Sequence, residues 1–162
     1  MLDRFDLALL NLLQADALAT AETLGAEVAL SPSAITRRLR RLRDSGVIAR
    51  SVAILSPKLT DRRLRAIVQV QLHEHAAQKG LADLRQRLLD SPEVQLCLEV
   101  SGTFDLLLLI VSSDMTAFNA FADAQLAADE SVRRYETSFV KKEIKNQPAV
   151  PLNERDLGEY SG

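Results

Sequence analysis

Five arginines gather within nine residues of the sequence, in the stretch ITRRLRRLR that spans residues 35–43. The large apolar side chains of this stretch, Ile35, Leu39 and Leu42, recur at helical spacing and would form one narrow stripe. The stripe would face a core, so the arginines would face solvent together. Guanidinium groups bind phosphates and pair with guanine through two hydrogen bonds. This stretch is therefore a candidate for nucleic-acid binding.

An arginine-rich helix has two other interpretations besides DNA binding. A solvated surface helix is normally salt-paired, and the one acidic residue near these arginines in the sequence is Asp44. A helix lying on a membrane surface needs a broader apolar face with aromatic side chains. Neither pattern fits, and the expected partner is double-stranded DNA.

Three helices are expected within the first 45 residues. Leucines at helical spacing, with capping residues before them, predict helices over residues 3–15, 20–29 and 31–45. Ser31-Pro32 is typical of a helix start, and Gly46 of a helix end. A short join before the third helix is typical of a helix-turn-helix, in which the last helix enters the major groove with its N-terminal end first.

The third helix therefore contains most of the expected DNA contacts. Residues near its start would reach base edges, and residues further along would reach phosphates. The predicted DNA-contacting residues are Ser31, Ser33, Thr36, Arg37, Arg40, Arg41 and Arg43. Among the arginines, Arg37 would lie nearest the bases and Arg43 nearest the DNA backbone.

The charge is distributed unevenly along the chain. The 162 residues have a net charge of −2, yet residues 31–50 contain six arginines and only one acidic residue.

The single cysteine excludes an intramolecular disulfide and is typical of a reducing compartment. No apolar stretch approaches the ~20 residues of a membrane span, and no secretory signal is recognisable. We expect a cytoplasmic protein without a membrane partner.

A different pattern begins after a linker at residues 56–63. Strand-like alternation interrupted by two helical stretches predicts the order β-α-β-β-α-β, a ferredoxin-like α+β unit. The predicted strands are 66–72, 94–100, 104–112 and 132–144, the helices are 76–89 and 114–127, and a further strand-like segment covers 47–55. We expect an α+β chain with a three-helix (winged) helix-turn-helix domain and hinge strand over 1–60, a βαββαβ domain over 61–146 and a loose tail over 147–162.

The third strand of the second domain is apolar on both faces. Two helices can cover only one face, and each leucine left in water on the other costs roughly 1.5–3 kcal/mol. A second sheet from another subunit is the simplest cover, which predicts an obligate dimer of the α+β barrel type. Alternation also places Cys97 beside Gln95 and Glu99, in the layer between the subunits.

Three motifs resemble the Lrp/AsnC family, the feast/famine transcription regulators of bacteria and archaea. LDRFDLALLNLLQADA is similar to the family's opening helix, LGAEVALSPSAITRRLRRLRDSGVI to its helix-turn-helix, and VSGTFDLLLLI to the signature turn of its effector domain. The resemblance covers about residues 2–145. Ala29 stands where the family usually has glycine, and Thr103 stands where charged residues are common.

The resemblance implies a sequence-specific transcription regulator that binds operator DNA as a dimer. It implies that dimers assemble into tetramers or octamers, and that a small-molecule effector, commonly an amino acid, binds between dimers. The effector residues implied are Ser101, Gly102, Thr103, Asp105 and Thr137. Gly102 would let the ligand approach the backbone, and Asp105 would pair with its ammonium group.

An enzymatic function is the alternative to a DNA-binding regulator. Some tetrapyrrole (sirohaem) decarboxylases look like the same architecture, but their basic, aromatic and histidine-bearing motifs have no clear counterpart in VIARSVAIL or VQLCLEVSG. A stand-alone amino-acid sensor is a third possibility, which the basic helix disfavours. His73 and His75 have no cysteine or carboxylate placed to complete a metal site. We expect no enzymatic activity, no cofactor and no metal.

Overall fold

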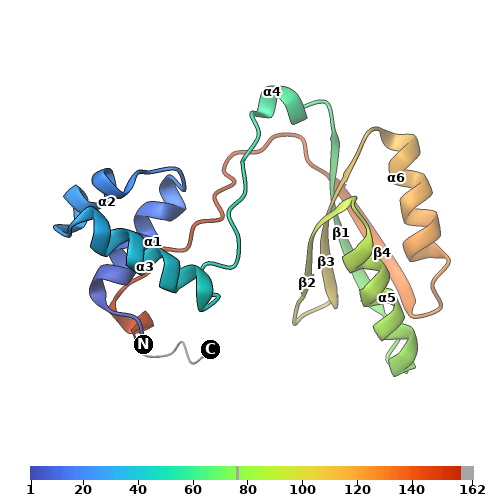
Figure 1. Ribbon diagram of the computed structural model, residues 1–162. Coiled ribbons are helices and arrows are strands. Elements are labelled where there is room, and N and C mark those ends of the chain that lie inside the picture. The colour runs from blue at the N-terminus through green and yellow to red at the C-terminus, as the bar shows by residue number, and fades with distance from the viewer. Residues whose placement is uncertain (76, 158–162) are drawn as a thin grey trace. The chain divides into compact units, whose positions relative to one another are not determined.

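The computed structural model (Figure 1) describes residues 1–75 and 77–157. The chain divides into two compact units. The first contains residues 1–54 together with the segment from Lys145 onward, and the second contains residues 55–144. The chain therefore passes from the first unit into the second and back again, so two covalent segments join the units.

Three helices form the body of the first unit: α1 (Arg4–Ala15), α2 (Ala21–Val28) and α3 (Pro32–Asp44). Each begins after a capping residue, Asp3, Thr20 or Ser31, whose side chain accepts a hydrogen bond from a backbone N–H of the first turn. The core of this unit contains Leu9, Leu24, Val28, Ile35 and Leu39. The helix-turn-helix is confirmed, and the apolar stripe of α3 faces inward as predicted.

The turn between α2 and α3 is tight. Ala29 has φ 56° and ψ 46°, a left-handed conformation that is unfavourable for a residue with a Cβ atom. The N–H of Leu30 then donates to the carbonyl of Gly25 at 3.0 Å. A Cβ atom on Gly25 would lie 2.5 Å from the Leu30 carbonyl oxygen. The turn therefore requires glycine at position 25 and is strained by alanine at position 29.

Residues 47–55 pair with no strand in the described part of the same chain, so the predicted hinge strand is not formed within one chain. The apolar side chains of Val52, Ile54 and Leu55 are consequently exposed. The tail is not loose, since residues 150–152 are hydrogen-bonded to side chains of α1.

The second unit has the predicted βαββαβ order. Its elements are β1 (Leu64–Leu72), α5 (Gln78–Asp90), β2 (Val94–Glu99), β3 (Leu106–Ser112), α6 (Met115–Ala122) and β4 (Val132–Phe139). A short helix α4 (Pro57–Thr60) precedes them, and a π-helical turn (Asp123–Ala127) extends α6. The strands are antiparallel in the order β2-β3-β1-β4, which is the ferredoxin-like arrangement.

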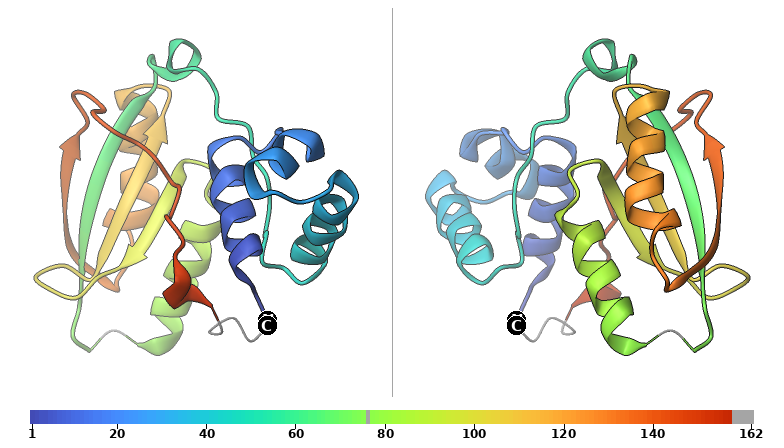
Figure 2. Two further views of the ribbon diagram at one scale, coloured as in Figure 1. Left: turned by 90° about the vertical axis from the view of Figure 1, so that its left-hand side faces the viewer. Right: turned by 90° about the vertical axis from the view of Figure 1, so that its right-hand side faces the viewer.

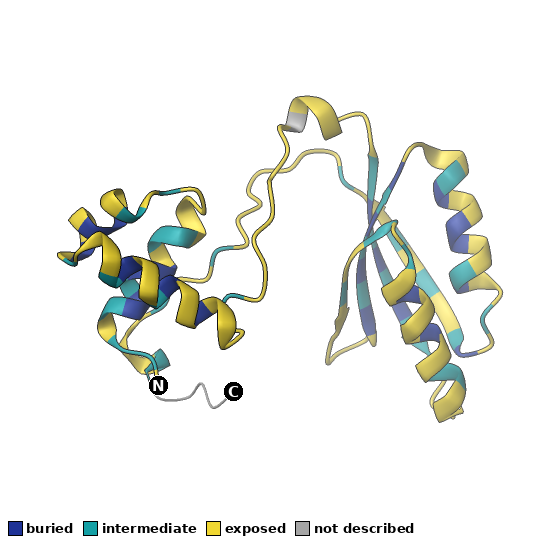
Figure 3. Cartoon of the chain, viewed as in Figure 1, coloured by how far each residue is buried: buried dark blue, intermediate teal, exposed yellow. Residues whose placement is uncertain are grey.

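Helices α5 and α6 cover the same face of this sheet (Figure 2). The core between them and the sheet contains Ala66, Val68, Val70, Leu84, Leu88, Leu106, Leu108, Ile110, Phe118, Phe121 and Leu126. The opposite face, which we call the open face, contains the half-buried Leu107, Leu109 and Val111. On this face Leu96 and Leu98 are 40% and 45% exposed. Figure 3 shows how far the residues of each element are buried. The predicted apolar open face of β3 is therefore present.

The expectation that Cys97 belongs to the open face is wrong. A register shift between Val94 and Leu96 turns the alternation of β2, so that Cys97 pairs with Leu108 and packs against the helix-covered core. Burial, and then the charge of Glu99, raise the pKa of its thiol. Leu96 and Leu98 occupy the open face instead.

Candidate nucleic-acid interface and effector loop

Small polar side chains lie exposed at the start of α3. The Ser31 hydroxyl accepts a hydrogen bond from the N–H of Ala34 at 3.3 Å and lies 3.1 Å from the Ser33 hydroxyl. The Thr36 hydroxyl donates to the Pro32 carbonyl at 2.9 Å, which fixes its orientation. Each hydroxyl can form one further hydrogen bond, as donor or as acceptor, with another partner.

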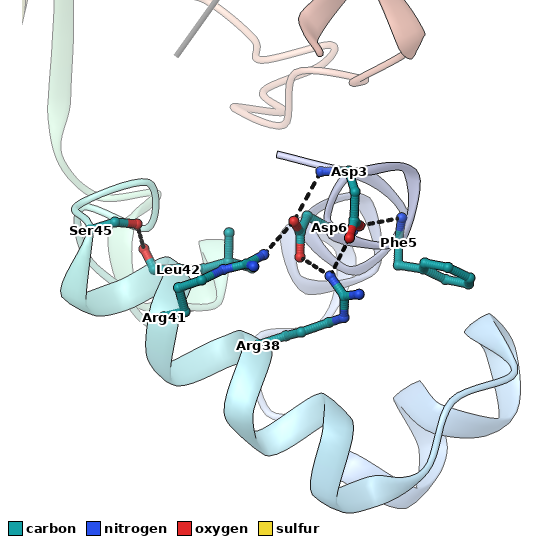
Figure 4. Close-up of polar contacts among 7 residues, drawn as sticks. All are labelled: Asp3, Phe5, Asp6, Arg38, Arg41, Leu42 and Ser45. Carbon is teal, nitrogen blue, oxygen red and sulfur yellow. Dashed lines mark hydrogen bonds and ion pairs between the residues drawn. The ribbon is translucent and has the colours of Figure 1, made fainter. Parts of the chain in front are cut away.

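The five arginines of α3 divide into two groups. Arg37, Arg40 and Arg43 are exposed and make no ion pair with any residue that the structure describes. Arg38 and Arg41 instead turn toward α1, where they meet carboxylates (Figure 4). The predicted basic surface thus exists, but only part of its charge is free for an external partner.

Asp6 on α1 is the residue to which Arg38 and Arg41 bind, and its carboxylate is fully buried. Its Oδ1 accepts from Arg38 Nη1 at 2.8 Å, and its Oδ2 accepts from Arg41 Nη2 at 2.5 Å. The backbone N–H of Asp3 also donates to Oδ2, at 3.0 Å. Because this buried charge has three partners, α3 is oriented on α1 by ionic hydrogen bonds as well as by its apolar stripe.

Asp3 completes the cluster from the helix cap. Its Oδ2 accepts from Arg38 Nη1 at 2.7 Å, and its Oδ1 accepts from the N–H groups of Phe5 and Asp6 at 2.9 Å. Burial alone would raise the pKa of Asp3, but the hydrogen bonds from the Asp6 N–H and from Arg38 lower it below its usual value. The hydrogen bond to Asp3 is the main factor that raises the pKa of Arg38.

Sequence reasoning missed this cluster. The expectation that only Asp44 could pair with the arginines is wrong, because their partners come from a different helix. Two signals could have revealed it: the D-x-x-D spacing of Asp3 and Asp6, which is that of a capping box, and the angular position of Arg38 beside the apolar stripe.

The loop between β2 and β3 lies at the end of the sheet. Ser101, Gly102 and Thr103 are exposed, and Gly102 has φ 151°, which a residue with a side chain rarely adopts. Asp105 binds the neighbouring strand: its N–H donates to the Val70 carbonyl at 2.9 Å, and its Oδ2 accepts from the Leu72 N–H at 2.8 Å. One carboxylate oxygen of Asp105 therefore supports the sheet, and the other remains available.

Thr137 lies away from this loop, whereas Arg134 lies beside it. Thr137 pairs with Val68, whose side chain lies in the helix-covered core. Arg134 is on the open face opposite Gln71, to which its Nε donates at 2.9 Å. The Arg134 guanidinium carbon lies 5.3 Å from the ring centre of Phe104, a loop residue. Arg134 was not singled out from the sequence, because alternation alone does not reveal which strand end reaches the loop.

Metal sites and membrane-spanning helices are absent from the part of the chain that the structure describes. Within residues 1–75 and 77–157, no group of three or more histidine, cysteine or acidic side chains is arranged to hold a metal ion. Among the helices in that part of the chain, none is long and apolar enough to cross a bilayer. His73 and His75 lie beyond the end of β1 and line a polar cavity of about 880 Å³ with charged residues such as Arg87 and Asp129.

Known protein families match both units. Residues 2–43 match the AsnC-type helix-turn-helix domain, and residues 65–150 match the Lrp/AsnC ligand-binding domain. An HTH-type transcriptional regulator of Haemophilus influenzae is 34% identical over 152 residues, which is 93% of this chain and 89% of that protein. The Bkd operon transcriptional regulator of Pseudomonas aeruginosa is 30% identical, over 93% and 98% of the two chains.

Solved structures agree with this assignment. A transcriptional regulator of Neisseria meningitidis, crystallised in complex with L-Met, superposes with a TM-score of 0.85 at 35% identity and covers 96% of this chain and 99% of its own. An AsnC family transcriptional regulator of Agrobacterium tumefaciens gives a TM-score of 0.82 at 29% identity, over 93% and 97% of the chains. With a helix-turn-helix that exposes arginines and a ferredoxin-like second unit, the chain belongs to the Lrp/AsnC family of transcriptional regulators.

Proposed function

We propose that this regulator reads double-stranded DNA by placing α3 in the major groove. The observation that carries the proposal is the row of exposed arginines, Arg37, Arg40 and Arg43, on a helix oriented by the Asp6 cluster. Ser31, Ser33, Thr36 and Arg37 would lie near the bases at the N-terminal end of α3. Arg40 and Arg43 would bind phosphates, and Arg41 would add a phosphate contact through the donors that Asp6 leaves unused.

A gel-shift titration tests this proposal. The probes are a duplex from the region upstream of the protein's own gene and a random duplex of equal length. We expect tighter binding to the upstream duplex, and an affinity for both that falls steeply with salt because several phosphates are neutralised. Equal affinity for the two duplexes at physiological salt would contradict sequence-specific binding.

We infer that the second unit binds an amino-acid effector at the β2–β3 loop. The Neisseria meningitidis relative was crystallised with L-Met, and this chain has groups of suitable charge at the loop. Asp105 would pair with the ligand's ammonium group, and the exposed backbone at Ser101, Gly102 and Thr103 would meet its carboxylate together with Arg134. Thr137 would act indirectly, through the position of β4.

A thermal-shift screen with the twenty amino acids tests the effector. A ligand at 100 times its dissociation constant stabilises the native state by about 2.7 kcal/mol, which is readily detected. An amino acid that stabilises the wild-type chain but not Asp105→Ala supports the assignment. Equal stabilisation of both chains would place the ligand elsewhere.

We further propose that the protein works in the cytoplasm as a homodimer that assembles into tetramers or octamers. The open face of the sheet, with Leu96, Leu98, Leu107 and Leu109, supports burial against a second sheet. Residues 47–55 support it too, because strand-like residues without a partner in their own chain can pair with another copy. Light scattering at micromolar concentration tests the proposal, and a monodisperse monomer would contradict it.

A further inference from the structure

The returning C-terminal segment makes a paired contact with α1. Asn11 donates from Nδ2 to the Leu152 carbonyl and accepts from the Leu152 N–H at its Oδ1, both at 2.9 Å. Gln14 does the same with Val150, donating at 2.9 Å and accepting at 2.7 Å. Two side-chain amides thus bind the N–H and C=O of alternate residues, as a neighbouring β-strand would. We call Asn11 and Gln14 the amide clamp.

The spacing of the residues on α1 and on the C-terminal segment explains why this contact forms. Asn11 and Gln14 are three residues apart and share one face of α1. Val150 and Leu152 are two apart in an extended chain, so their backbone groups point to the same edge. Pro148 and Pro151 favour an extended backbone before docking, which reduces the entropy lost on binding. The intervening Pro151 has no N–H to leave unpaired on the opposite edge.

An apolar groove and a capped turn lie beside this contact. A groove of about 750 Å³ lies between α1, the segment after α3 and the tail; its lining includes Leu7, Leu10, Leu13, Val47, Ile48, Val150 and Leu152. Directly after Leu152, Asn153 starts a 3-10 turn, Glu154–Asp156, through a capping box with Asp156. The segment therefore ends in an ordered turn.

We propose that residues 145–157 form a strap that binds the amide clamp of their own chain and couples β4 to the DNA-binding unit. β4 ends at Phe139, and the strap engages α1 from Val150. The strap is thus a second tether, in addition to the connection after α3. A displacement of β4 on effector binding is transmitted through it to α1, and from there to α3 through Asp6. The coupling step rests on the proposed DNA-binding and effector functions, whereas the strap itself does not.

Hydrogen exchange on the full-length protein tests whether the clamp holds the strap. Asn11→Ala with Gln14→Ala removes both the amide donors that face the two carbonyls and the amide oxygens that face the two N–H groups, and it adds no charge. The Val150 and Leu152 amides should exchange at least about tenfold faster in this variant than in the wild-type chain. Glu27→Ala, on the exposed face of α2, is the control and should leave both rates unchanged. Equal rates in wild type and clamp variant would overturn the strap.

Cross-linking tests whether the strap is bound by its own chain. Ala15 and Ala149 both line the groove, so Ala15→Cys with Ala149→Cys in a Cys97→Ser background leaves the clamp intact. A short bismaleimide should give a cross-linked species of monomer mass on a denaturing gel. A product of dimer mass would show that the strap binds a second copy, which would overturn the proposal as stated.

The coupling role is tested by measuring how much the effector changes the affinity for DNA. We expect the clamp variant to bind the upstream duplex within about twofold of wild type, because no clamp residue lies on α3, but to lose most of the effector-dependent change in affinity. An unchanged effector response would overturn the coupling while leaving the hydrogen-exchange result standing. If the wild-type chain binds no DNA, the proposed function fails, but the exchange and cross-linking results still decide the strap.

Discussion

The buried carboxylate of Asp6 accepts a hydrogen bond from Arg38 at 2.8 Å, and this pair fixes α3 on α1. Arg38 is 20% exposed and Asp6 is not exposed at all, so neither charge can be fully solvated if the other is removed. The pair occupies an arginine of α3 that would otherwise be free for an external partner. The pair also holds the neighbouring exposed side chains of α3 in a fixed direction relative to α1.

Removing Asp6 should therefore be strongly destabilising. Asp6→Ala leaves the half-buried Arg38 paired with Asp3 alone and removes the partner of Arg41, so it is expected to cost roughly 3 kcal/mol of the stability of the first unit. Urea unfolding followed by circular dichroism, with the transitions of the two units fitted separately, measures this cost. Asp44→Ala, an exposed change on α3, is the control and should stay within about 0.5 kcal/mol. Similar costs for both variants would show that the cluster is not a structural anchor.

The strained turn predicts a stabilising substitution. Ala29→Gly removes the Cβ atom from a left-handed residue and should stabilise the first unit by about 0.5–1 kcal/mol. Ala26→Gly, the same exchange at an exposed site inside α2, should cost about 0.5–1 kcal/mol. Thermal unfolding of both variants measures the difference. If both variants lose stability, the conformation of Ala29 is not strained.

The pKa of Asp3 predicts how stability depends on pH. Its folded-state pKa lies below that of the unfolded chain, so the ionised carboxylate stabilises the fold above the unfolded value of about 3.9. This stabilisation is lost as the pH falls through the lower folded-state pKa. Unfolding of wild type and Asp3→Asn between pH 7 and pH 2.5 should show a gap that is largest near neutrality and closes in acid. A gap that widens in acid would contradict the assigned direction.

The sequence was sufficient to predict what depends on periodicity and capping. The three N-terminal helices and their caps, the βαββαβ order and the inward stripe of Ile35 and Leu39 all follow from local pattern. It was not sufficient to predict contacts between residues that lie far apart in the sequence. Asp6 and Arg38 are 32 residues apart, and Gln14 and Val150 are 136 apart. The position of Cys97 depended on a single register shift in β2, which alternation cannot reveal.

The open face predicts a site at which assembly can be blocked. Leu109 pairs with Ile67 and Leu96 on this face. Leu109→Glu would bury a charge in the proposed dimer interface, so we expect it to give a monomer by light scattering. Leu89→Glu makes the same exchange at a side chain on α5 that is 72% exposed, and it should leave assembly unchanged. A dimeric Leu109→Glu chain would show that the subunits associate through another surface.

The most direct test of DNA reading by α3 is the ratio of affinities for the upstream and random duplexes, measured for three arginine variants. Arg37→Ala should lower the ratio by about tenfold or more, as expected when a contact worth about 1–3 kcal/mol of base discrimination is lost. Arg43→Ala should weaken binding to both duplexes equally and leave the ratio intact. Arg85→Ala, which removes one charge from the second unit, should change neither. An unchanged ratio in Arg37→Ala, or equal losses for Arg37→Ala and Arg85→Ala, would contradict the account.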